Sequence, residues 1–279
     1  MTPSLTLALS SWSVHRALGI MYPNTPANDV PGAPTETWGP GTVSLMELPA
    51  TAAKLGFKRM HVCHFHLASR DKGYLGEVRQ AFADAGVTLQ ALLIDNGDIT
   101  HAGERERDIA WIGAWIDAAA ELGARTARVI AGKQKPSPET LGLSVAGLKT
   151  LAARGREKGV RVITENWFDL LAGPMEVDHV LDRLDGEVGL LVDFGNWKGP
   201  QKYGNLAAVL GRAEDTHAKC HFERVGEMDS DDFGRCLAAA RTAGYDGPYT
   251  LIYEGPDADE WEAVEMERDF VNDFFARPL

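Results

Sequence analysis

Residues 158–165 read KGVRVITE. In this stretch a glycine that ends a helical pattern is followed at once by a short apolar strand, which finishes in a carboxylate. The same order recurs at LGFKRMHV (55–62), AGVTLQAL (85–92), LGARTARV (122–129) and AGYDGPYTLIYE (243–254). Repeated helix–glycine–strand units with continuous apolar strands are typical of a parallel sheet that helices cover.

Working outward from these units, we predict eight strands, at 5–10, 59–66, 88–95, 126–131, 161–165, 189–193, 216–221 and 249–254. The amphipathic segments between them predict helices at 45–54, 75–85, 104–122, 138–158, 177–184 and 231–243, and a last helix within 257–275. Eight such units in 279 residues favour a closed barrel over an open sheet. We therefore expect an α/β fold, a single (β/α)8 TIM barrel domain over residues 1–279.

Residues 19–43 interrupt this pattern after the first strand. They are rich in Pro, Gly, Asn and Thr and show no helical period. We predict an irregular loop insertion on the side of the barrel where active-site loops lie. Two interpretations stay open: a surface excursion, or a lid that carries Tyr22 and Trp38.

Composition narrows the class of protein. The net charge is −12, which argues against nucleic acid as a partner because phosphate backbones attract basic surfaces. No run of 18 apolar residues exists, so we expect no membrane span, and the first ten residues lack the basic start of a secretory signal. Three widely spaced cysteines, Cys63, Cys220 and Cys236, argue against a disulfide framework and favour a cytoplasmic location.

The quaternary structure is left open. Three tryptophans on predicted outer helices, Trp111, Trp115 and Trp261, would be candidates for a contact in a homo-oligomer.

Acidic and imidazole side chains stand at the ends of the last four predicted strands. Glu165, Asp193, His217 and Glu254 follow or lie within buried strands, and the C-terminal ends of barrel strands converge on one mouth. Charged groups at such positions are costly to bury without partners, so a shared cation explains them best. Three carboxylates and one imidazole favour one divalent metal ion, Mn or Mg, and are compatible with Zn or Co.

The motifs around these residues are ITEN (163–166), LLVDFGNW (190–197), THAK (216–219) and LIYEG (251–255). With them the chain resembles the xylose isomerase-like barrels, a family that includes sugar-phosphate isomerases, ketose 3-epimerases, inosose dehydratases and endonuclease IV. The resemblance covers nearly the whole chain and is strongest from the fifth strand onward. It implies that the four residues named above bind the metal, and that the two glutamates move protons on either face of a substrate carbon.

The chemistry is consistent with that double role. Removing a proton next to a carbonyl needs a nearby base, and a metal that chelates the carbonyl stabilises the enediolate. Lys219 shares a strand face with His217 and is predicted to hold a hydroxyl or an oxyanion. His221 is predicted to lie at the rim, either on the substrate or as a solvated histidine. Trp167 is one of several aromatic residues at the mouth that favour a small carbohydrate.

Two positions depart from the family. Many members have Asp-x-x-His where this chain has Asp193-Phe-Gly-Asn196, and an amide binds a sugar hydroxyl but is no base at neutral pH. The second strand carries VCHFHL, in which we expect His64 and His66 on one face and His61 on the other, with His66 facing the substrate. The partner histidine that the endonuclease branch uses after the third strand is absent.

These features predict a metal-dependent isomerase or epimerase that acts on a small sugar, keto-sugar or polyol. A dehydratase acting on a keto-inositol uses the same proton abstraction and is not separated from it by sequence. An endonuclease IV-like hydrolase and a non-catalytic metabolite-binding barrel are the remaining alternatives. Asn196 is the best support for the last, and the pair of glutamates argues against it.

Overall fold

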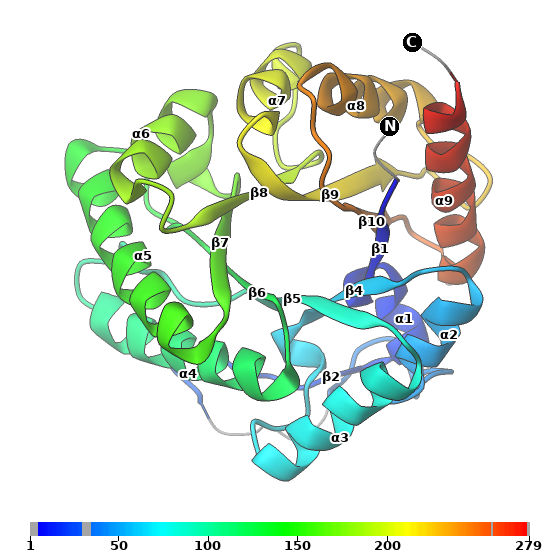
Figure 1. The fold of residues 1–279 in the computed structure, drawn as a ribbon, viewed down its shortest axis with the longest axis horizontal. Helices are drawn as coiled ribbons and strands as arrows, with labels where there is room; N and C mark the ends of the chain where they lie inside the picture. Colours follow the sequence, from blue (N-terminus) through cyan, green and yellow to red (C-terminus); the bar gives the residue numbers. More distant parts are fainter. Residues whose placement is uncertain (1–4, 30–34, 258, 278–279) are drawn as a thin grey trace.

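The computed structural model describes residues 5–29, 35–257 and 259–277. Parallel strands close into a barrel in the order β1-β10-β9-β8-β7-β6-β5-β4, which confirms the predicted α/β TIM barrel (Figure 1). The strands are β1 (Leu7–Ser10), β4 (Arg59–Cys63), β5 (Thr88–Ile94), β6 (Thr126–Val129), β7 (Arg161–Glu165), β8 (Gly189–Asp193), β9 (Ala213–His221) and β10 (Tyr249–Glu254).

Helices surround the barrel on its outside (Figure 1). The helix α5 shows why the sequence pattern works: Ser137 and Thr140 form a capping box at its start, and Gly159 ends it at φ 73°, a left-handed conformation that glycine adopts without strain. The outer helices are α2 (Leu48–Lys54), α3 (Lys72–Asp84), α4 (Arg105–Leu122), α5 (Pro138–Lys158), α6 (Pro174–Leu184), α7 (Lys202–Leu210), α8 (Ser230–Thr242) and α9 (Glu260–Ala276).

Two helices fall outside the sequence prediction. The helix α7 reads KYGNLAAVL, and its glycine and asparagine are weak helix formers that hid it. A single turn, α1 (His15–Leu18), follows the 3-10 helix η1 (Ser11–Val14) after β1. None of the helices that the structure describes is long and apolar enough to cross a membrane.

The end of the second barrel strand was predicted wrongly. The strand β4 stops at Cys63, and His64–His66 form a 3-10 helix, η2. Because that helix turns once in three residues, the alternation of a strand does not extend to these histidines, and His64 and His66 do not share a strand face. His61 lies in the strand proper and is fully buried.

The insertion after β1 is fastened to the barrel. Its short strands β2 (Ile20–Met21) and β3 (Thr35–Glu36) pair antiparallel, and the Tyr22 amide donates to the Phe65 carbonyl at 2.8 Å. The Asn24 side-chain oxygen accepts hydrogen bonds from the indoles of Trp111 and Trp115 at 2.9 and 3.1 Å. Residues 30–34 of the insertion lie outside the described residues.

Those indole contacts also bear on the tryptophans considered for an oligomer contact. Trp111 and Trp115 are buried within the chain itself, at 4% and 1% exposure, and Trp261 packs partly buried against the core. The first two are therefore unavailable to a partner chain. A homo-oligomer stays a prediction without them.

Apolar side chains form two separate regions. Most pack between the barrel and the surrounding helices. A much smaller cluster, Cys63, Ala91 and Leu93, lies apart from that core, with Trp12 and Phe65 packed against it. Because β4 and β5 supply this small cluster, one side of the barrel mouth is apolar.

Candidate metal and substrate site

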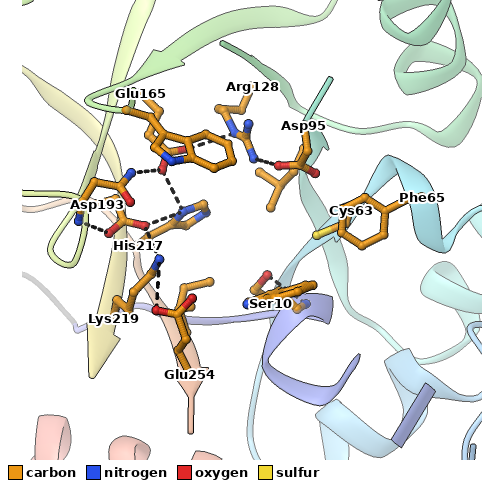
Figure 2. Close-up of a pocket in the computed structure, with 15 residues that line it drawn as sticks. Ser10, Cys63, Phe65, Asp95, Arg128, Glu165, Asp193, His217, Lys219 and Glu254 are labelled. Atoms are coloured by element: carbon orange, nitrogen blue, oxygen red, sulfur yellow. Dashed lines mark hydrogen bonds and ion pairs between the residues drawn. The ribbon is translucent and has the colours of Figure 1, made fainter. Parts of the chain in front are cut away.

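A pocket of about 230 Å³ opens at the C-terminal ends of the barrel strands (Figure 2). This is the mouth where the functional sites of such barrels lie. Its lining mixes charged, amide and aromatic side chains: Ser10, Trp12, Cys63, Phe65, Leu93, Asp95, Arg128, Glu165, Trp167, Asp193, Asn196, His217, Lys219, Ile252 and Glu254.

Three of the predicted metal ligands meet in this pocket. Glu165 ends β7, Asp193 ends β8, and His217 lies beside Asp193 on β9. One ligand atom from each lies within 4.8 Å of the others, and all three residues are buried. The His217 Nδ1 is 3.7 Å from Glu165 Oε1 and 3.5 Å from Asp193 Oδ2. Ligands of one cation with bonds of about 2.1 Å lie roughly 3–4 Å apart, so the donor set fits a divalent metal.

The charges around the three residues favour a positive charge between the two carboxylates. Burial disfavours the charged form of His217, but Glu165 and Asp193 outweigh it and raise the pKa of His217 to about 9. Burial likewise opposes ionisation of Asp193, yet Lys219 and His217 hold its pKa well below the usual range. Asp193 therefore stays ionised and attracts positive charge to the space beside it.

Hydrogen bonds decide which carboxylate oxygen faces that space. Asp193 Oδ1 accepts from the backbone amides of Gly195 and Asn196 at 2.6 and 3.1 Å, which leaves Oδ2 toward His217. The Asn196 side-chain amide donates to Glu165 Oε1 at 2.8 Å. Asn196 thus orients a candidate ligand and also lines the pocket.

Glu254 differs from the other three. It ends β10 and lines the pocket, but its side chain is 56% exposed, and it does not belong to the compact group. Its carboxylate lies 3.7 Å from the Lys219 ammonium, which is also 3.3 Å from Asp193. Burial disfavours the charge on Lys219, but the surrounding carboxylates led by Asp193 raise its pKa, so it remains a cation.

Sequence reasoning missed Arg128, which lies across the pocket from Lys219 (Figure 2). Its guanidinium is 2% exposed, pairs with Asp95, and has its Nε 3.0 Å from Glu165 Oε2. Its guanidinium carbon also lies 5.2 Å from the centre of the Trp167 ring. Burial opposes the charge on Arg128, but Asp95 and Glu165 outweigh it and raise its pKa. An arginine inside the short strand TARV was the signal that could have found it.

A buried chain of hydrogen bonds behind His217 was also missed. His61 Nε2 is 3.2 Å from Asp215 Oδ2, and His61 Nδ1 is 3.2 Å from His217 Nε2. A carboxylate only accepts, so His61 Nε2 carries the proton and, in the neutral ring, His61 Nδ1 accepts from His217. When a metal displaces the second proton that the raised pKa favours, the lone pair of His217 is left on Nδ1, which faces Glu165 and Asp193. This arrangement resembles the carboxylate–histidine support of metal ligands in general.

The remaining predicted substrate contacts divide into two groups. Trp167, Asn196 and Lys219 line the pocket, whereas His66 and His221 are not among its lining residues. His66 is 2% exposed and its Nδ1 bonds the Ser11 hydroxyl at 2.8 Å; burial lowers its pKa to about 3. His221 is exposed at the end of β9. The structure therefore does not bring these two histidines to the candidate metal ligands.

Comparison with solved structures finds the same fold among sugar-active and metal-containing proteins. The D-allulose 3-epimerase from Methylomonas sp. aligns at a TM-score of 0.69 and 16% identity over 97% of this chain and 98% of that chain. The 3-keto-D-glucoside 4-epimerase from E. coli aligns at 0.64 and 16% identity over 82% and 94%. A xylose isomerase-like TIM barrel protein from Mycobacterium smegmatis, in complex with magnesium, aligns at 0.66 and 18% identity over 97% and 96%.

Comparison with curated proteins finds no match. The family model described as xylose isomerase-like TIM barrel matches residues 49–273, which covers every barrel strand except β1. This chain belongs to the xylose isomerase-like TIM barrel family.

Proposed function

We propose that the protein is a divalent-metal-dependent isomerase or epimerase of a small sugar, keto-sugar or polyol. The observation that carries the proposal is the meeting of Glu165, Asp193 and His217 in one buried pocket. Two carboxylates and one imidazole favour Mn or Mg and are compatible with Zn or Co. A divalent cation bound there would polarise a substrate carbonyl and stabilise the negative charge that develops on its oxygen.

The two glutamates are placed for unequal parts in proton transfer. Glu165 is held by Arg128 on one oxygen and by Asn196 on the other, so its position is fixed. Glu254 is more than half exposed, and the Lys219 ammonium is the cation beside it in the described chain. We assign proton abstraction next to the carbonyl to Glu254, and we assign Glu165 the opposite face of the substrate carbon as well as metal ligation.

Three side chains are proposed to orient the sugar. The Lys219 ammonium is placed to donate to a hydroxyl or to a developing oxyanion. The Asn196 amide offers a further polar group, and the Trp167 ring offers an aromatic face. The proposal does not depend on His66 or His221.

The test begins with metal analysis of the purified protein, followed by solvent deuterium exchange into a panel of ketoses. Exchange at the carbon next to the carbonyl is expected with bound metal, and Glu254→Gln or Glu165→Gln is expected to abolish it. The matched control is Glu262→Gln, because Glu262 is exposed on α9. Metal binding without exchange into any sugar would argue for a hydrolase or a binding protein instead.

A dehydratase is the second candidate, and Lys219 favours it. An ammonium that lies between Asp193 and Glu254 is placed to give a proton to a departing hydroxyl. Both reactions begin with the same proton abstraction. Mass analysis separates them, because a dehydratase product is lighter than its substrate by one water, whereas an epimerase product has the same mass.

A further inference from the structure

An outer groove continues the candidate active-site pocket toward solvent. The groove encloses about 550 Å³, against about 230 Å³ for the inner pocket. The two share four lining residues, Trp167, Asn196, Lys219 and Glu254. Because Lys219 and Glu254 line both spaces, the groove lies directly beside the inner pocket.

Phe168 lines this groove and has an unusual backbone conformation. Its backbone has φ 58° and ψ 179°, a region that is almost confined to glycine. The ring is 38% exposed and stacks on Trp167, with 4.4 Å between ring centres and 29° between planes. The turn is held on both sides, by the hydrogen bond from the Trp167 amide to the Glu165 carbonyl at 2.8 Å and by the fully buried Leu170.

Strain of this kind persists where the surrounding structure enforces it, and it is concentrated at ligand sites. At Phe168 its effect is to place a large apolar ring at the solvent edge of the groove instead of in the core. A single exposed ring is ordinary by itself, but one that backbone strain holds at the edge of a cavity is positioned to contact a ligand there.

The rest of the lining defines the chemistry of the occupant. Beyond the shared residues, the groove adds Asp169, Lys198 and the amide of Asn205. One carboxylate and one ammonium leave these additions without net charge, as Lys219 and Glu254 do together. An uncharged ring that carries hydroxyl groups suits this combination of aromatic faces, amides and balanced charges.

We propose that the groove binds the second ring of an uncharged glycoside, whose reacting keto-sugar ring lies in the inner pocket. The inference rests on the proposed function only in placing that keto-sugar at the metal ligands. The inner pocket, at about 230 Å³, has room for one small sugar ring, and the groove supplies the additional space.

The test compares two probes that share one reacting ring, 3-keto-D-glucose and 4-hydroxyphenyl 3-keto-D-glucoside, whose second ring is uncharged and carries a hydroxyl group. Their dissociation constants are measured by calorimetry with Mn²⁺ present, and solvent deuterium exchange is followed in parallel. The protein is expected to bind the glycoside about tenfold more tightly than the free sugar. Phe168→Ala is expected to lower that preference about three- to tenfold, because one aromatic contact is lost.

Two further variants separate binding from folding. Phe168→Gly removes the ring but accepts the φ of 58° without strain, so it is expected to lose the preference while its thermal midpoint is kept or raised. Met175→Ala is the matched control, since Met175 is 78% exposed on α6 and lines neither the groove nor the inner pocket. It is expected to keep the preference.

The outcomes separate the proposal for the groove from the proposed isomerase or epimerase activity. Equal affinity for the two probes, or a preference that survives both Phe168 variants, overturns the groove proposal even where both sugars exchange deuterium. A Phe168-dependent preference without exchange supports the groove and counts against the isomerase or epimerase. Failure to bind either probe with Mn²⁺ present overturns the groove proposal for this class of ligand.

Discussion

The two sides of the barrel mouth differ in the polarity of their side chains. Strands β6 to β10 supply a charged wall, from Arg128 on β6 to Glu254 on β10 (Figure 2). Strands β4 and β5 supply an apolar wall, in which Cys63 and Leu93 pack with Phe65. Asp95, which follows β5, pairs with Arg128 and belongs to the charged wall. A bound sugar would therefore present its hydroxyls and carbonyl to one wall and its carbon–hydrogen face to the other. The difference orients the substrate before any single contact is considered.

Burying the charged wall costs stability, whereas burying the apolar wall does not. A buried carboxylate without a partner is strongly destabilising, so each carboxylate must meet a cation. Arg128 serves Asp95 and Glu165, and Lys219 serves Asp193 and Glu254. Each carboxylate of the wall therefore has a cation beside it before a metal binds, and the excess of negative charge over the two cations is left for a metal.

The largest loss of stability is expected for Arg128→Met, which removes the ion pairs with Asp95 and Glu165. The variant leaves Asp95 and Glu165 buried without their cation, which typically costs about 3–5 kcal/mol of unfolding free energy. Urea unfolding measures this loss. Arg212→Met is the control, because the exposed Arg212 pairs with Asp178 and Asp182 on the surface and should cost at most about 1 kcal/mol.

A second substitution checks the cause of that loss. Adding Asp95→Asn to Arg128→Met removes one of the two stranded charges, so part of the stability is expected to return. If the double variant is as unstable as the sum of the two single changes, the pairing argument is wrong.

The next effect is expected at the metal ligands. Asp193→Asn keeps the shape of the side chain but removes a charge that faces His217 and Lys219. Affinity for Mn²⁺ is expected to fall by about 100-fold or more, since changes behind a ligand already cost about 10- to 100-fold. Calorimetric titration with Mn²⁺ measures it, with Asp178→Asn on α6 as the surface control. Unchanged affinity would exclude Asp193 as a ligand.

The barrel and its strand-end carboxylates were predictable because both follow from local pattern. In KGVRVITE the glycine, the apolar run and the final carboxylate lie within eight consecutive residues, and β7 was placed at Arg161–Glu165 from them. The same pattern placed β10 correctly, and an apolar run that ends in a carboxylate placed β8. Local order fixes a strand, and strand ends in a parallel barrel share one mouth.

The partners across the barrel were not predictable in this way. His61 and Asp215 come from strands far apart in the sequence, and they meet only once the register of β9 is set. The position of His66 outside the pocket lining was missed for a different reason. The boundary of β4 was misplaced by three residues, and that error moved a side chain from the pocket to a neighbouring 3-10 helix.

A smaller loss of metal affinity is expected from a substitution at His61, which lies behind His217. His61→Gln removes the imidazole that accepts from His217 Nε2, so His217 is no longer held in the form that turns its Nδ1 lone pair toward Asp193. Affinity for Mn²⁺ is expected to fall by about tenfold. His101→Gln, at an exposed position, is the control.

Nitrogen chemical shifts give an independent reading of this role. In the wild type loaded with diamagnetic Mg²⁺, His217 is expected to carry its proton on Nε2, and His61→Gln is expected to give a mixture of the Nε2-protonated and Nδ1-protonated forms. A proton found on Nδ1 of His217 in the wild type would contradict the proposed hydrogen bond from His217 Nε2 to His61, whatever the metal affinity.

The last prediction concerns Glu267 on α9, where a substitution is expected to change stability but not metal binding. Unlike the ion-paired carboxylates of the charged wall, this carboxyl is favoured in its neutral form by burial. It is fully buried, and burial raises its pKa well above the usual range, an effect that the Cys220 backbone offsets only in part. Below the unfolded pKa of 4.5 both states hold the proton. As the pH rises above that value the unfolded chain releases it first, so unfolding free energy falls by about 1.4 kcal/mol per pH unit until the folded pKa is passed.

Glu267→Gln removes this titration while keeping the shape of the side chain. The variant is therefore expected to gain stability over the wild type as the pH rises from about 4.5, without a change in Mn²⁺ affinity. Urea unfolding at a series of pH values measures the difference, with the partly exposed Glu265→Gln on the same helix as the control. A difference that stays constant with pH would show that Glu267 is ionised in the folded protein. In that event a buried carboxylate would persist here without the cations that stabilise the charged wall.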